Sequence, residues 1–173
     1  MDKMKTMLNL ISELLPRLTA ASKVSLGPDI TWPAYGGVFI ANPPASVCRR
    51  LGAGPPPTPA PPLDSRVLGH WERTFENVVL LLVDGFGLDM FQAALAAGWN
   101  DLPQDSLLAA LTSVAPSTTA AALTTLWTGA YPAEHGVIGY ELFLKEYGMI
   151  ANMITHNPVG YPPGAAGLGG GGV

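Results

Sequence analysis

The stretch that decides the expected fold is NVVLLLVDGFG, which occupies residues 77–87. Residues 78–83 form a continuous apolar run that includes β-branched valines, and Asp84 follows it directly. Such a run is typical of a strand that is buried on both faces, as in a parallel sheet. The two glycines after the acid predict a turn at residues 84–87.

Helices and strands alternate on the C-terminal side of this stretch. Residues 88–97 and 120–128 are each apolar, helix-like and followed by a stopping glycine, and residues 106–114 are a second strand candidate. The order strand, helix, strand, helix predicts a parallel sheet with right-handed crossovers. Further along, residues 140–145 and 149–154 flank a short turn and predict a β-hairpin.

The N-terminal side and the C-terminal end have a different composition. Residues 4–18 have the apolar spacing of an amphipathic helix that Pro16 kinks or ends, either packed on the domain or lying on a membrane surface. A short strand is expected at residues 37–40. The proline density of residues 43–62 predicts an extended polyproline connector without helix, or else an SH3-like ligand. The glycines of residues 160–173 predict an unstructured tail or an incomplete loop.

Overall composition excludes several classes of protein. Of the 173 residues 48% are hydrophobic and 13% charged, with a net charge of -4, which excludes a charge-rich disordered chain and a basic nucleic-acid-binding module. The single cysteine, Cys48, excludes an intrachain disulfide and a cysteine-based zinc site. No apolar run approaches the roughly 18 residues of a membrane span, and the N-terminus lacks a signal-peptide pattern. We therefore expect a cytoplasmic protein.

Two polar features follow the two predicted strands. Asp84 ends the first strand, and Ser117, Thr118 and Thr119 come after the second, at the start of a predicted helix. Ligands of open α/β sheets bind beyond the carboxyl ends of the strands, so the two features are expected to share one site. From the pattern alone, Asp84 is either a turn carboxylate or a metal ligand. The hydroxyl cluster is either a plain helix cap or a phosphate site that contains a nucleophile.

Three stretches together resemble the alkaline phosphatase superfamily, and in particular its type I phosphodiesterase/nucleotide pyrophosphatase branch. They are VVLLLVDGFG at residues 78–87, PSTT at 116–119 and LWTGAYPAEHGV at 126–137. The resemblance covers residues ~75–157 and implies an α/β, alkaline phosphatase-like fold, with a mostly parallel sheet and flanking helices, present as an N-terminal fragment. The expected parts of the chain are a helix and proline-rich lead-in (1–76), the N-terminal part of a catalytic domain (77–157) and a glycine-rich tail or truncated loop (158–173).

The resemblance also implies roles for single residues. Asp84 corresponds to the strand-end carboxylate that binds one of two metal ions. The nucleophile of the superfamily lies ten residues before the glycine of the Thr-Gly pair, here Gly129. This makes Thr119 the expected nucleophile and metal ligand, with Thr118 as runner-up. His135, in the His-Gly part of the signature, is expected to have a structural role.

The implied chemistry is hydrolysis of a small phosphoester with two divalent metal ions, zinc being the expected metal, and with no membrane or nucleic-acid polymer as partner. Two departures from the family stand out. Ala122 occupies a position where nucleotide pyrophosphatases usually carry an asparagine, and no aspartate follows Thr119. The remaining metal ligands are therefore absent, and we expect either an inactive fragment of a longer enzyme or a degenerate relative. The alternatives are a phosphomonoesterase or phosphomutase of the same superfamily, and a non-catalytic binding or scaffold protein.

Overall fold

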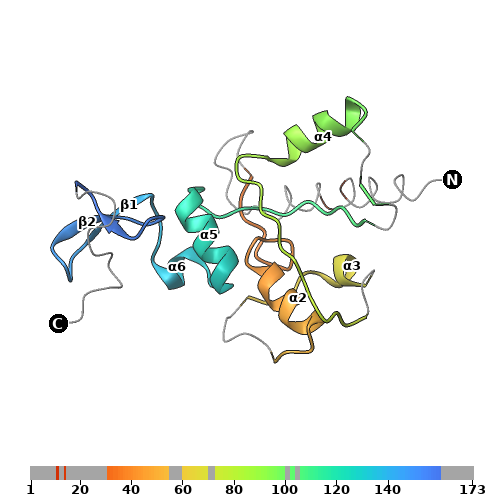
Figure 1. The fold of residues 1–173 in the computed structure, drawn as a ribbon, viewed down its shortest axis with the longest axis horizontal. Helices are drawn as coiled ribbons and strands as arrows, with labels where there is room; N and C mark the ends of the chain where they lie inside the picture. Colours follow the sequence, from red (N-terminus) through yellow and green to blue (C-terminus); the bar gives the residue numbers. More distant parts are fainter. Residues whose placement is uncertain are drawn as a thin grey trace.

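The computed structural model describes residues 11, 14, 31–54, 60–69, 73–99, 102–103 and 106–160. These residues form a small α/β structure (Figure 1). Its helices are α2 (Asn42–Arg50), α3 (Ser65–Leu68), α4 (Leu88–Ala96), α5 (Thr119–Thr128) and α6 (Pro132–His135), and its strands are β1 (Glu141–Leu144), β2 (Met149–Asn152) and β3 (Asn157–Pro158). None of the helices in this part of the chain combines the length and the apolar character needed to cross a membrane.

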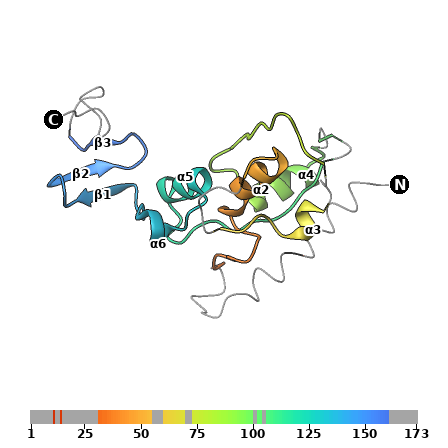
Figure 2. The same ribbon diagram turned by 90° about the horizontal axis from the view of Figure 1, so that it is seen from below.

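The sheet is antiparallel and has the strand order β1-β2-β3. The predicted hairpin is confirmed: β1 and β2 pair from Glu141 opposite Asn152 to Leu144 opposite Met149. Gly148 closes the connecting turn with a positive φ of 62°, which glycine adopts without strain. Figures 1 and 2 show the sheet at one end of the molecule, beyond α6. The expectation of a mostly parallel sheet is therefore wrong for the described residues.

The apolar run at residues 78–83 is not a buried strand. It is extended, has no ladder partner among the described residues, and leaves Val79 92% and Leu81 84% exposed. Val78, Leu80 and Leu82 are only about half as exposed, because alternate side chains of the run point toward the rest of the protein. A continuous apolar strand becomes buried only when neighbours cover both of its faces, and the described residues supply no such neighbours.

The second predicted strand, residues 106–114, is extended and makes one parallel bridge. Thr112 pairs with Phe39, because the Thr112 amide donates to Val38 O (2.9 Å) and the Ile40 amide donates to Thr112 O (3.0 Å). The short strand expected at residues 37–40 is thereby reduced to this bridge. In Figure 1, α4 lies on one side of the extended segment, and α2 and α3 lie on the other.

The prediction that residues 43–62 contain no helix is wrong. Helix α2 begins with Pro43 and Pro44 in its first turn, where a missing amide N–H costs nothing, and residues 45–54 contain no further proline. The end of the segment also packs: Ala60 is buried, and the Asn42 side-chain amide donates to Pro61 O at 2.8 Å. Residues 55–59 lie outside the described residues, as does most of the glycine-rich end.

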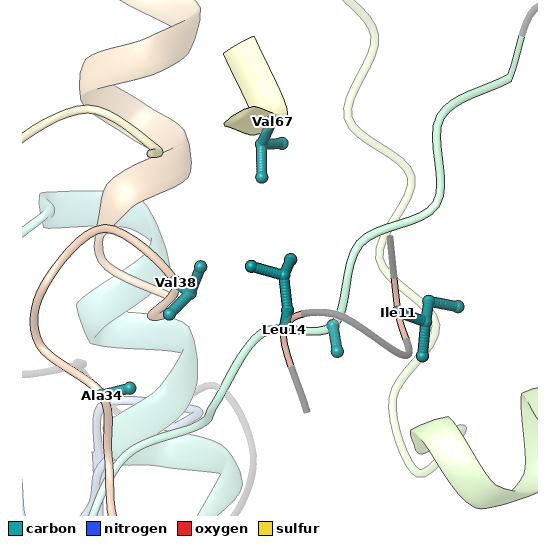
Figure 3. Packing of buried hydrophobic residues seen from close by; sticks show 6 residues of the cluster. Ile11, Leu14, Ala34, Val38 and Val67 are labelled. Carbon is teal, nitrogen blue, oxygen red and sulfur yellow. The ribbon is translucent and has the colours of Figure 1, made fainter. Parts of the chain in front are cut away.

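Two hydrophobic clusters join distant parts of the sequence. The first cluster, drawn in Figure 3, consists of Ile11, Leu14, Ala34, Val38, Val67 and Ala110. The second consists of Phe39, Ala41, Ala60, Val114 and Ala121. Ile11 and Leu14 are the only described residues of the amphipathic stretch at 4–18; both are helical and buried, and the rest of that prediction lies outside the described residues. The clusters hold the segment around Thr112 and the start of α5 against residues 34–41.

Candidate active site

Asp84 lies in the turn after the apolar run. Gly85 has a φ of 72°, and its amide donates to Asp84 Oδ1 at 3.0 Å. This bond aligns the carboxylate with the turn but leaves Oδ2 without a protein partner among the described residues. The carboxylate is exposed, so it remains available to a cation or to solvent.

Thr119 is the first residue of α5, and the neighbouring Thr118 is its N-cap. Thr118 Oγ1 accepts a hydrogen bond from the Ala121 amide at 3.2 Å, the usual bond of an N-cap hydroxyl. The capping task therefore falls to Thr118. No described residue hydrogen-bonds the Thr119 hydroxyl, which leaves it as the uncommitted hydroxyl of the pair at the positive end of the helix dipole.

Asp84 and Thr119 line one cavity of about 450 Å³. Ser113 lines it too, as do backbone atoms or side chains of residues 85–87. The apolar walls come from Ile40, Leu82, Val83, Ala122, Leu123 and Leu126. The structure thus brings together in one cavity two residues that lie 35 positions apart in the sequence.

Ser113 lies within the second predicted strand, and the sequence pattern does not mark it as a site residue. A signal was nevertheless present, because Ser113 is a polar residue near the carboxyl end of a predicted strand, four residues before the hydroxyl cluster. Residues at that edge of an α/β sheet are the ones that reach a ligand.

His135 uses both ring nitrogens within the protein. Its Nδ1 accepts from the Val137 amide at 3.0 Å, so the proton of the neutral ring sits on Nε2, which lies 2.9 Å from Thr125 Oγ1 and donates to it. Thr125 is fully buried in α5. Desolvation lowers the pKa of His135, an effect that the nearby Glu134 carboxylate opposes. The histidine therefore holds α6 against α5, in line with the structural role implied by the resemblance.

The other residues of the TGAYPAEHG stretch have conformational tasks. Gly129 and Gly136 end α5 and α6 in the left-handed region, with φ of 67° and 74°, and Pro132 starts α6. The Tyr131 amide donates to Glu134 Oε2 at 2.7 Å, and the Tyr131 ring packs edge-on against Tyr35. Burial raises the pKa of Tyr131, and Glu134 and Tyr35 add to that effect.

The donor atoms in the cavity are too few for a zinc site. Asp84 and Thr119 offer one carboxylate and one hydroxyl, whereas protein zinc sites take three or four protein ligands. No group of three or more His, Cys, Asp or Glu side chains that could hold a metal ion occurs in the part of the chain that the structure describes. The described residues alone do not fit the two-metal centre that the resemblance implies.

The chain matches the family model of type I phosphodiesterase / nucleotide pyrophosphatase over residues 78–159. The resemblance inferred from the three motifs is thereby confirmed for this segment, which makes up a little under half of the 173 residues and is consistent with a partial family member. No curated protein and no solved structure matches the chain. Asp84, Ser113, Thr119 and His135 all lie inside the matched segment.

Proposed function

We propose that residues 78–159 carry the nucleophile-bearing part of a metal-dependent phosphoric ester hydrolase of the phosphodiesterase type. The observation that carries the proposal is the cavity that Asp84 and Thr119 share. The family match supports the reaction class, and the uncommitted hydroxyl of Thr119 supports its assignment as nucleophile. A small phosphoester is the expected substrate.

In the proposed reaction, the Thr119 oxygen forms a bond to phosphorus as the bond from phosphorus to the leaving alcohol oxygen breaks. The hydroxyl proton passes to solvent, and the departing alkoxide takes up a proton from solvent. Water then attacks phosphorus of the threonine phosphodiester, and the bond from phosphorus to the Thr119 oxygen breaks, which releases the phosphomonoester product and restores the hydroxyl. The start of α5 favours this attack because its positive potential stabilises charge that develops on the phosphoryl oxygens.

Asp84 supports the metal dependence of the proposal through its charge. The carboxylate and an anionic phosphoester in one cavity repel each other unless a cation lies between them. Asp84 would be one ligand of that cation, and the remaining ligands that the resemblance implies are absent from this chain. Zinc remains the expected metal.

The test is turnover of bis(4-nitrophenyl) phosphate by the protein as its gene encodes it, assayed with Zn²⁺. Thr119→Ala is expected to lower kcat by roughly 10³-fold or more, since a covalent nucleophile is lost. Thr119→Ser keeps a hydroxyl and should retain measurable turnover. The matched control is Thr124→Ala, which alters a hydroxyl of the same helix that bonds Ala120 O and does not line the cavity.

Full activity in Thr119→Ala would overturn the assignment of the nucleophile. Loss of turnover in Thr118→Ala but not in Thr119→Ala would move the nucleophile to the N-cap residue. Absence of phosphodiesterase activity from the wild-type protein would overturn the proposed function itself.

A further inference from the structure

The polar side chains of the cavity are Asp84, Ser113 and Thr119. The proposed reaction uses the first as a cation ligand and the third as the nucleophile. It gives no task to Ser113, although this hydroxyl lines the same cavity. Like Thr119, it has no hydrogen-bond partner among the residues that the structure describes.

The backbone at Ser113 is held in place by its neighbours. Thr112 is bridged to Phe39, and its own hydroxyl accepts from the Ala34 amide at 2.8 Å and donates to Val38 O at 3.3 Å. Thr112 and Val114 are buried, whereas Ser113 between them is exposed. Because side chains alternate across an extended segment, fixing Thr112 inward sets Ser113 outward, on the cavity side.

The wall next to the nucleophile lacks a side-chain donor. Ala122 follows Thr119 by one turn of α5 and lines the cavity with a methyl group, and Leu123 and Leu126 continue that wall. A phosphodiester has two non-bridging oxygens that gain charge during attack, and these are stabilised by donors placed around them. Apart from Thr119 itself, Ser113 is the described side chain of the lining that has a hydroxyl to donate.

We propose that Ser113 is a substrate-contacting residue that donates its hydroxyl to a non-bridging phosphoryl oxygen. This inference rests on the proposed function, because it assigns a further residue to the same cavity. All phosphoester substrates share the phosphoryl group and differ in the alcohol that it carries. We therefore expect Ser113 to contact every such substrate in the same way.

The experiment compares Ser113→Ala, Ser113→Thr and Ser106→Ala in the protein as its gene encodes it. Ser106 lies on the same extended segment and lines no part of this cavity, so its substitution is the matched control. With bis(4-nitrophenyl) phosphate and Zn²⁺, Ser113→Ala is expected to lower kcat/KM by about 10- to 100-fold, the effect of losing one hydrogen bond to a charged group. Ser113→Thr restores the hydroxyl and should recover most of the loss.

Binding of inorganic phosphate, followed by calorimetry, gives a readout that does not depend on turnover. Ser113→Ala should raise the Kd for phosphate about tenfold or more, while Ser113→Thr and Ser106→Ala leave it near the wild-type value. Equal values for Ser113→Ala and Ser106→Ala in both measurements, or wild-type protein that binds no phosphate, would overturn the role of Ser113. If Thr119→Ala is inactive while Ser113→Ala is fully active, only the Ser113 inference fails and the proposed function stands.

Discussion

At the scale of single residues, His135 couples protonation to the packing of two helices. A second proton on the ring would have to sit on Nδ1, which already faces the donating amide of Val137. Protonation therefore breaks this bond and leaves two N–H groups opposed. The hydrogen bond from Nε2 to Thr125 survives in either form, since Nε2 carries a proton in both.

The sign of the resulting pH dependence follows from the lowered pKa of His135. The folded protein binds the proton less readily than the unfolded chain, whose histidine titrates near 6.5. The stabilisation is therefore fully present above about pH 6.5 and is lost as the pH falls through the lower, folded pKa. The Glu134 carboxylate opposes the lowering of the His135 pKa, and the group that faces the ring from α5 is the uncharged Thr125 hydroxyl.

We expect a NMR titration of the His135 ring to give a midpoint below 6.5. In urea unfolding, the stability difference between wild type and His135→Gln should shrink as the pH is lowered from 7.5 to 5. The control variant is His156→Gln. His156 is exposed, and its ring makes no hydrogen bond of this kind with the described residues. A stability difference that is constant over this pH range would contradict the link.

The sequence alone indicates that Asp84 and Thr119 belong to one site. It does not indicate which other residues surround them. Both residues sit where local signals are strong, at a strand end and at a helix start. Ser113 and Thr125 were missed because their roles depend on the far side of the fold. Ser113 faces the cavity only through the bridge at Thr112, and Thr125 gains a partner only when α6 packs on α5.

At the scale of elements, helix α5 is ended by a residue in a left-handed conformation. Gly129 has a φ of 67°, and its amide donates to Thr125 O. An L-residue at such a position costs about 1–2 kcal/mol. Gly129→Ala is therefore expected to lower the free energy of unfolding by about that amount, measured by urea denaturation with circular dichroism.

The control for this substitution is Gly54→Ala. Gly54 has an ordinary negative φ or extended backbone, and an added Cβ would meet no atom within 4 Å. It should change the unfolding free energy by less than about 0.5 kcal/mol, as is usual for surface positions. An equal loss in the two variants would show that the conformation of Gly129 does not matter to stability.

The elements that were predicted correctly depend on local signals. Helices α4 and α5 and the β1–β2 hairpin follow from stop glycines, hydroxyl caps and a glycine turn within a few residues. Helix α2 was missed because proline content was averaged over residues 43–62, although the prolines fall in its first turn and beyond its end. The strand at residues 78–83 depends on neighbours that apolar composition alone does not supply.

At the scale of the whole molecule, the apolar run at residues 78–83 is an aggregation hazard. It is uncharged and free of proline, its Val79 and Leu81 side chains are almost fully exposed, and its backbone has no ladder partner among the described residues. Segments of this kind pair with copies of themselves. We expect Val79→Lys combined with Leu81→Lys to slow the rise of light scattering on concentration of the protein.

The same substitutions should leave the unfolding free energy within about 0.5 kcal/mol, because both side chains already face solvent. Ile138→Lys introduces a charge at an exposed apolar residue outside the run and should have little effect on scattering. If Ile138→Lys suppresses aggregation as strongly as the double variant, the benefit comes from replacing any exposed apolar residue with lysine and not from the apolar run in particular.

The bridge between Phe39 and Thr112 can form only late in the synthesis of the chain. Ala34 and Thr112, which share a hydrogen bond, are 78 positions apart. At a translation rate of about 5–20 residues per second, the N-terminal segment waits roughly 4–16 s for its partner to be made. During that interval Val38, Phe39 and Ala41 have no Ala110, Val114 or Ala121 to pack against. These apolar side chains therefore stay without their packing partners until the helix that carries Thr119 has been synthesised.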